Sequence, residues 1–199
     1  MAVSIESVQQ TLKTVLDPNT QIDLMTAKAV KNLKVDDGAV SLDVVLGYPA
    51  KSQIDLIRTL VVNAIRKLPD VKNVSVNVTS SIVAHAVQRG VKLMPNVKNI
   101  IAVVSGKGGV GKSTVSANLA IALAQGGAKV GLMDADIYGP SVPMMFGVRG
   151  ERPKMTEVNG KAMIVPMEKY GIKFMSIGLL VNEKDAIVWR GPMASSAIR

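Results

Sequence analysis

The sequence predicts an α/β protein in two parts, a small α+β unit followed by a unit built on a parallel sheet. Residues 4–80 alternate between helix-like and strand-like apolar spacing, whereas residues 100–104 form a continuous apolar run directly before a glycine-rich loop. A second buried strand is predicted over residues 129–133. Continuous apolar runs are typical of parallel strands covered on both faces. We therefore expect a first domain over residues 1–85, a linker over 86–98 and a second domain over 99–199.

Charge and composition argue against several classes of function. The formal net charge is +9, but the basic excess is spread evenly, with 12 Lys/Arg against 8 Asp/Glu in residues 1–98 and 12 against 7 in residues 99–199. Aromatic residues that would stack on bases make up only 3 % of the chain, so we expect no nucleic-acid partner. The sequence has neither a signal peptide nor a bilayer-length apolar run, so we expect a cytoplasmic protein with no membrane partner.

Cysteine is absent from all 199 residues. This excludes disulfides, thiolate metal sites and cysteine nucleophiles within the chain. The single histidine, His85, lies in an apolar run, where we expect a packed or surface side chain rather than a metal ligand.

The first part reads as helix, strand, strand, helix, strand. A helix with apolar residues at positions 5, 8, 12 and 15 is expected to stop at Asp17-Pro18, because proline disfavours helical backbone in the residue before it. Asp37-Gly38 predicts a hairpin between strands over 30–35 and 40–46. Ser52 and Asp55 resemble a capping box that opens a second helix, which we expect to end at Pro69. Alternating valines predict a third strand over 74–78.

The second part is predicted to contain a helix after the glycine-rich loop and further short strands. The helix should end at Gly126-Gly127, and one apolar face is expected from Val115, Leu119, Ala122 and Leu123. Short strands are expected over residues 164–167 and 172–177.

The glycine-rich loop matches the pattern G-x-x-x-x-G-K-[ST] at Gly106, Gly111, Lys112 and Ser113. A chance match in a chain of this length is on the order of 1 %. The loop follows a predicted strand and opens a predicted helix, so backbone N–H groups converge on phosphate oxygens. We expect Lys112 to face the β- and γ-phosphates and the Ser113 hydroxyl to bind Mg²⁺. The predicted ATP-binding residues are Gly106, Lys107, Gly108, Gly109, Val110, Gly111, Lys112, Ser113 and Thr114.

Lys107, directly after the first glycine, is not required by an ordinary P-loop. Together with Lys112 it resembles the deviant Walker A pattern of the MinD, ParA and nitrogenase-iron-protein class of ATPases. That resemblance implies a homodimer in which Lys107 reaches the phosphates bound by the partner subunit, as an arginine finger would.

Asp134 and Asp136 follow the second predicted strand of this part, at the edge where open α/β sheets place their ligands. A plain polar turn is the alternative. The same resemblance implies that Asp136 positions the attacking water and that Asp134 holds Mg²⁺ through water, which makes Lys107, Lys112 and Asp136 the candidate catalytic residues.

Two further segments narrow the resemblance. Residues 137–141 (Ile-Tyr-Gly-Pro-Ser) and 189–193 (Trp-Arg-Gly-Pro-Met) are similar to the Mrp/ApbC family of iron-sulfur cluster carrier ATPases. Asp17-Pro18 and residues 47–49 (Gly-Tyr-Pro) resemble the small iron-sulfur-assembly domain at the front of bacterial members. The resemblance implies a homodimer that uses ATP and Mg²⁺ and carries an iron-sulfur cluster to apoproteins. The fold expected is a small α+β domain followed by the first part of a P-loop parallel-sheet ATPase domain.

The chain also departs from that family. Members of the family continue with a Walker B aspartate, a Pro-Pro-Gly loop and a Cys-x-x-Cys pair that holds the cluster, and none of these occurs in the 199 residues. We therefore expect an N-terminal fragment or truncated product that by itself holds no cluster and hydrolyses little ATP. The alternatives are a MinD- or ParA-like positioning ATPase and a non-enzymatic module that binds a partner through residues 1–80.

Overall fold

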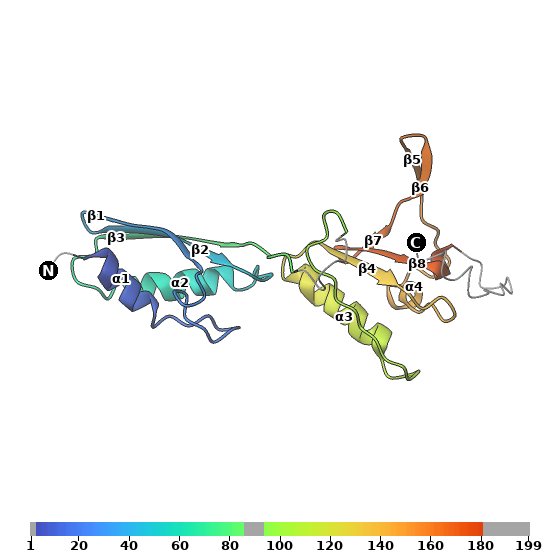
Figure 1. Cartoon of the computed structure of the whole chain (residues 1–199), viewed down its shortest axis with the longest axis horizontal. Helices are drawn as coiled ribbons and strands as arrows, with labels where there is room; N and C mark the ends of the chain where they lie inside the picture. Colours follow the sequence, from blue (N-terminus) through green and yellow to red (C-terminus); the bar gives the residue numbers. More distant parts are fainter. Residues whose placement is uncertain (1–2, 86–93, 181–199) are drawn as a thin grey trace. The chain divides into compact units, whose positions relative to one another are not determined.

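The computed structural model describes residues 3–85 and 94–180 (Figure 1). Backbone contacts divide the chain into two units, Met1–Ile100 and Ile101–Arg199. The predicted family segment at residues 189–193 and most of the predicted linker lie outside the described residues.

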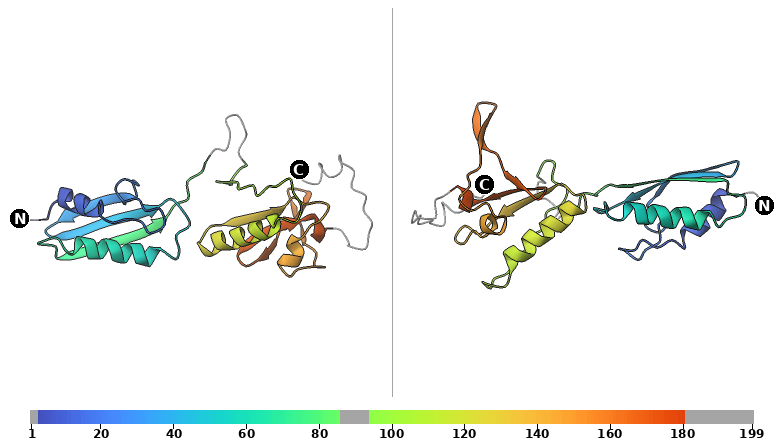
Figure 2. Two further views of the ribbon diagram at one scale, coloured as in Figure 1. Left: turned by 90° about the horizontal axis from the view of Figure 1, so that it is seen from below. Right: turned by 180° about the vertical axis from the view of Figure 1, so that it is seen from behind.

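The N-terminal unit has the predicted order of elements. Helix α1 (Ile5–Leu12) precedes the strands β1 (Val30–Asp36) and β2 (Ala39–Leu46), and α2 (Ile54–Ile65) connects β2 to β3 (Asn73–Ser80). The sheet order is β1-β2-β3, with β1 and β2 antiparallel and β2 and β3 parallel. Both helices cover the same face of this sheet (Figure 2). The predicted hairpin at Asp37-Gly38 is confirmed, with both residues in the left-handed region at φ 40° and 80°.

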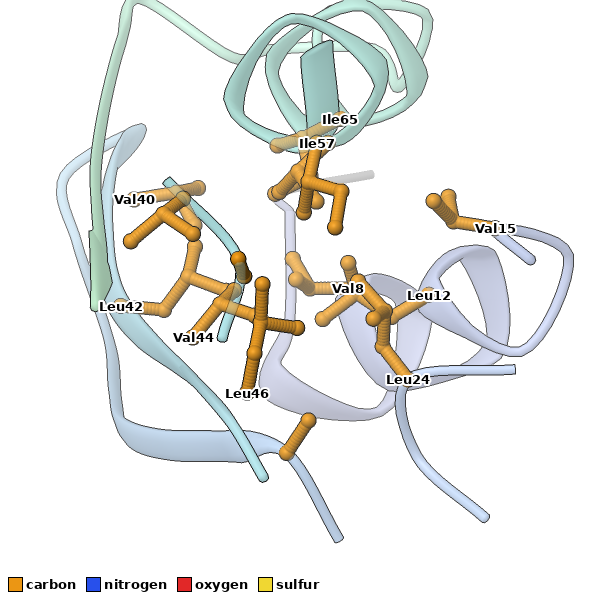
Figure 3. Close-up of a cluster of buried hydrophobic side chains, with 14 residues drawn as sticks. Val8, Leu12, Val15, Leu24, Val40, Leu42, Val44, Leu46, Ile57 and Ile65 are labelled. Atoms are coloured by element: carbon orange, nitrogen blue, oxygen red, sulfur yellow. The ribbon is translucent and has the colours of Figure 1, made fainter. Parts of the chain in front are cut away.

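The core of this unit lies between the two helices and the sheet (Figure 3). Every second residue of β2 faces it, namely Val40, Leu42, Val44 and Leu46, all buried. The helices contribute a second set of buried residues, Val8, Leu12, Ile57, Val61 and Ile65. Burial of each such side chain stabilises the fold by about 1.5–3 kcal/mol. The period-2 and period-3.6 patterns therefore meet in one continuous apolar cluster.

The helix ends differ from the sequence predictions. Helix α1 ends at Leu12 rather than at Pro18, because the following residues fold back into an isolated bridge between Leu16 and Asp23. The capping box predicted at Ser52 is wrong: Gln53 occupies the cap position with a helical backbone and no side-chain hydrogen bond. A side-chain cap needs an extended backbone at that position. Ala50 instead accepts the N–H groups of Gln53 and Ile54 through its carbonyl oxygen.

Helix α2 also ends early, at Ile65 rather than Pro69. A short turn follows, in which Leu68 N–H donates to the carbonyl of Ile65 at 3.0 Å. Proline therefore marks the latest possible end of this helix and not its actual end.

The C-terminal unit carries a smaller sheet. Helix α3 (Lys112–Gln125) leads to β4 (Val130–Asp134), and β4 pairs in parallel with β8 (Ile172–Ser176). Strand β7 (Met167–Lys169) pairs antiparallel with β8, so β4 is an edge of this sheet. The short helix α4 (Val142–Met145) and the 3-10 turn η1 (Ile177–Leu179) flank it, and β5 (Met155–Val158) and β6 (Lys161–Ile164) form a projecting hairpin (Figure 1).

The core of the C-terminal unit is organised around two aromatic rings. Phe146 and Phe174 are both 1 % exposed, and their ring centroids lie 4.7 Å apart. Ala117 and Ala120 of α3 pack into the same cluster. The face predicted for α3 is therefore wrong, since Val115 is 54 % exposed. The apolar residues of this helix are not confined to one side, so spacing alone did not identify the buried face, and the small alanines allow the closest approach.

The strand predicted over residues 100–104 does not form. Ile100, Ile101 and Val104 are 55, 61 and 82 % exposed. A strand exists only when its backbone groups pair with a neighbour, and no segment among residues 3–85 and 94–180 pairs with this run. The double covering predicted for β4 is also wrong, since Met133 is 56 % exposed.

The remaining strand predictions are mixed. Strand β8 confirms the strand predicted over 172–177. The strand predicted over 164–167 is wrong, because it spans the end of β6, the loop at Pro166 and the start of β7. Asn159-Gly160, with φ 52° and 73°, is a hairpin signal that the sequence analysis missed.

The segments Asp17-Pro18 and residues 47–49, which carry the family resemblance of the N-terminal unit, contact each other in the structure. Asp17 is 4 % exposed, and the Tyr48 hydroxyl lies 2.9 Å from each of its carboxylate oxygens. The Asn19 N–H also donates to this carboxylate, at 2.8 Å. Burial and the neighbouring Asp17 carboxylate raise the pKa of Tyr48 from 10.0 to about 12.

We expect a pH-dependent loss of stability from this pair. The folded chain holds the Tyr48 proton more tightly than the unfolded chain, so this contribution is fully present below about pH 10 and is lost as the pH rises through about 12. Ionisation would place a phenolate against a carboxylate. Tyr48→Phe should remove the phenolate that titrates near 12 from an ultraviolet pH titration. Tyr170→Phe serves as the control, and a titration unchanged by Tyr48→Phe would contradict the pairing.

Candidate phosphate-binding site

The loop at residues 106–111 has the backbone shape that a phosphate site needs. Gly111 is the N-cap of α3 with φ 87°, and Gly109 has φ 70°. Residues with a Cβ rarely adopt this left-handed conformation. The two glycines therefore allow the chain to turn sharply into α3, whose first N–H groups have no partner within the helix.

The loop is also open to a ligand. A Cβ added at Gly106, Gly108, Gly109 or Gly111 would meet no atom within 4 Å. The space around these four glycines is thus open, and the positive end of the α3 dipole favours an anion at the start of the helix. Phosphate fits this arrangement of donors.

The structure places two lysines at this loop. Lys112 Nζ donates to the carbonyl oxygen of Lys107 at 3.3 Å, so the Lys112 side chain folds back over the loop. The Lys107 backbone N–H donates to Ser105 Oγ at 3.2 Å, and residue 107 is exposed. The Lys112 side chain is therefore held against the loop by this hydrogen bond. The Lys107 side chain makes no hydrogen bond to any of the described residues.

Ser113 and Thr114 occupy the first turn of α3. Ser113 is half-buried and Thr114 is exposed, and the carbonyl of Thr114 accepts from Asn118 Nδ2 at 2.8 Å. Ser113 therefore directly follows Lys112 at the start of α3, and its assignment to Mg²⁺ stays a prediction.

Asp134 and Asp136 lie at the end of β4, as predicted, but their oxygens already have protein partners. Asp134 Oδ1 accepts from the Asp136 N–H at 3.2 Å, and Oδ2 accepts from the Val142 N–H at 3.3 Å. Asp136 Oδ1 accepts from the Gly139 N–H at 3.0 Å. Each aspartate therefore accepts backbone N–H groups of the segment over residues 136–142, as the aspartates of a polar turn also do.

A third residue joins this group that the sequence analysis did not identify. Ser176, at the end of β8 and 1 % exposed, donates from Oγ to Asp134 Oδ2 at 2.9 Å. The two residues are 42 positions apart, and only the pairing of Asp134 with Ser176 in the β4–β8 register brings them together. The only feature of the sequence that could have indicated this contact is a serine at the end of a short apolar run.

The phosphate loop and the two aspartates form separate hydrogen-bonded groups. Among residues 3–85 and 94–180, neither aspartate bonds to a side chain of the loop. A hollow of about 40 Å³ opens beside Asp134, which is far smaller than the several hundred Å³ of a typical ligand pocket. The open loop at residues 106–111 is therefore the better candidate for the nucleotide.

The described residues provide no pre-formed metal centre and no membrane span. No group of three or more His, Asp or Glu side chains within residues 3–85 and 94–180 is placed to hold a metal ion. His85 is exposed, and its Nδ1 lies 2.9 Å from Asn99 Oδ1, as expected of a surface side chain. No helix in the described part of the chain is long and apolar enough to cross a bilayer.

Comparison with known proteins agrees with the two-part organisation. The family model described as "NUBPL iron-transfer P-loop NTPase" matches residues 96–199. The model described as "Iron-sulfur cluster assembly protein" matches residues 5–78.

Curated relatives match nearly the whole chain. An iron-sulfur cluster carrier protein from Aquifex aeolicus is 39 % identical, covering 98 % of this chain and 58 % of its own length. Another from Synechocystis sp. is also 39 % identical, covering 99 % of this chain and 56 % of its own length. The chain thus spans a little over half the length of these relatives.

One solved structure shares part of the sequence. It is a nucleotide-binding protein in complex with ADP from Archaeoglobus fulgidus, 46 % identical over 39 % of this chain and 31 % of its own, with a TM-score of 0.34. From the family matches, the chain belongs to the iron-transfer P-loop NTPase family, with an iron-sulfur cluster assembly match over its first part.

Proposed function

We propose that this chain is the ATP-binding part of an iron-sulfur cluster carrier, a homodimer that binds and hydrolyses ATP and delivers clusters to apoproteins. The observation that carries the proposal is the loop at residues 106–111, open to a ligand, turned by left-handed glycines and set at the start of α3. The carriers that match nearly the whole chain support the cargo and its recipients. The cytoplasmic location expected from the sequence stays a prediction.

The residues of the loop have distinct roles in this proposal. The loop N–H groups and the Lys112 ammonium bind the phosphates of ATP, and Ser113 with Asp134 orients Mg²⁺, with Asp134 acting through water. When bound, Mg²⁺ neutralises the charge that develops on the phosphates. Asp136 has one carboxylate oxygen without a protein partner among the described residues, and we assign it to the attacking water. Lys107 acts on the partner subunit, consistent with its exposure.

The cluster is cargo that this chain does not hold by its own residues. Iron-sulfur clusters are held by thiolates, four per cluster in the common case. The 199 residues include no cysteine and one histidine. The ligands of the cluster therefore come from outside this chain, and the chain supplies the nucleotide site.

Lys112→Ala should abolish ATP binding, because the phosphates lose their principal counter-charge. The loss should be at least about 100-fold, in line with the removal of one strong donor at an anion site. Equilibrium titration of the 199-residue chain with ATP measures it. Lys129→Ala, an exposed lysine of the same unit, is the matched control, and near wild-type affinity in Lys112→Ala would refute the site.

Lys107→Ala should separate binding from hydrolysis. When a residue that acts across a dimer on the transition state is removed, ATP binding should be largely kept. The rate of ATP turnover should fall by about 100-fold or more. Titration and steady-state hydrolysis, measured on a protein of full family length, give the two values. Equal loss of both, in a variant that still dimerises, would instead place Lys107 among the ground-state contacts of its own subunit.

The chain should not assemble a cluster. After anaerobic incubation with iron and sulfide and removal of the excess, we expect no stoichiometric iron and no visible absorption band, because thiolate ligands are lacking. A relative that contains a Cys-x-x-Cys pair is the positive control. A coloured, stoichiometric cluster on the cysteine-free chain would overturn this account.

A further inference from the structure

We propose that Ser176 is a positioning residue for Asp134, and that the turn Ser176-Ile177-Gly178 supports the loop over residues 135–143. This inference rests on the proposed role of Asp134 in Mg²⁺ binding. Neither Ser176 nor Gly178 belongs to the phosphate loop or to the aspartate pair. Ser176 pairs with Asp134 at the same end of the β4–β8 pairing, and Gly178 follows two residues later.

The first observation is the direction of the Ser176 hydroxyl. Its oxygen accepts the Gly178 N–H at 3.3 Å, which leaves its single proton for Asp134 Oδ2 at 2.9 Å. Ser176 is 1 % exposed, so water does not compete for this proton. A hydrogen bond to a carboxylate in a buried setting is stronger than one between neutral groups. The Asp134 carboxylate is therefore held in one orientation.

The second observation is the packing of Gly178, which is independent of that hydrogen bond. A Cβ added to Gly178 would lie 3.1 Å from Pro140 Cγ and 3.3 Å from Pro143 Cγ. Proline rings do not swing away as a long side chain does. Both prolines belong to the segment that follows Asp136, so the turn at Gly178 packs directly against the loop whose backbone the aspartates hold.

Together these contacts connect Asp134 and the loop that follows it to β8. Asp134 Oδ2 also accepts the Val142 N–H at 3.3 Å, so the orientation of the carboxylate determines how the loop closes at α4. Without the Ser176 hydroxyl, the Asp134 carboxylate would keep only two backbone donors among the described residues, the N–H groups of Asp136 and Val142. The carboxylate would then rotate more freely, and both the loop and any cation held through water would be less well fixed.

Ser176→Ala tests the proposal in two ways. In the nucleotide-free chain, the Val142 amide should exchange with solvent roughly tenfold faster, since a charge-assisted hydrogen bond that orients its acceptor is gone. In titrations with ATP, the Mg²⁺ concentration needed for half-maximal binding should rise severalfold, while ATP binding without Mg²⁺ stays unchanged. Ser176→Thr keeps the hydroxyl and should restore both readouts toward wild type. Ser52→Ala, an exposed serine of the other unit, is the control.

Gly178→Ala tests the packing with Ser176 left in place. We expect faster exchange of the Val142 amide, because the added methyl group displaces the two prolines. Gly131→Ala is the matched control, since a Cβ there meets its first neighbour, the Lys173 carbonyl oxygen, only at 3.9 Å.

Asp134→Asn separates this inference from the proposed function. If Asp134→Asn alters the Mg²⁺ dependence but Ser176→Ala changes neither amide exchange nor Mg²⁺ dependence, the positioning role is overturned. If Ser176→Ala speeds amide exchange and Asp134→Asn leaves the Mg²⁺ dependence unchanged, the positioning role is supported and the assignment of Asp134 to Mg²⁺ is overturned.

Discussion

The Asp134 carboxylate is the contact on which the C-terminal unit most depends. It accepts the Ser176 hydroxyl of β8, the Val142 N–H of α4 and the Asp136 N–H of its own loop. Asp134 thereby connects its own loop and the start of α4, eight residues away, to the end of β8, 42 residues away. Asp134 is half-buried, and a carboxylate that lost these donors would be less well solvated there, so the loop, the strand ends and the short helix are expected to order together.

The two units differ in how completely they bury their apolar residues and pair their strand edges. The N-terminal unit covers one face of its sheet with two helices and closes its outer loop with the Asp17–Tyr48 pair, so its apolar face is buried within the unit. In the part of the C-terminal unit that the structure describes, Ile101 and Val104 are exposed and no strand pairs with the outer edge of β4. Open edges and exposed apolar runs favour further association.

Structural predictions from the local residue pattern were confirmed where the conformation depends only on residues close together in the sequence. The alternation in β2 and the turn at Asp37-Gly38 each depend on neighbours within a few residues, and both have the expected conformation. The helix predicted after the glycine motif also forms, beginning at Lys112. Helix ends at Leu12 and Ile65 were missed because the chain beyond them finds better partners than another helical turn. The strand at 100–104 failed because a strand needs a neighbour, which no local pattern supplies.

By itself, the sequence determined the family, the phosphate loop and the lack of thiolate ligands, because each depends only on which residues are present and how they are spaced. The tertiary structure alone decided that Ser176 contacts Asp134, that Tyr48 contacts Asp17 and that α3 packs through its alanines. These contacts join residues up to 42 positions apart. They form only when strand register and helix packing bring the side chains within hydrogen-bond or van der Waals distance, and spacing along the chain does not encode that distance.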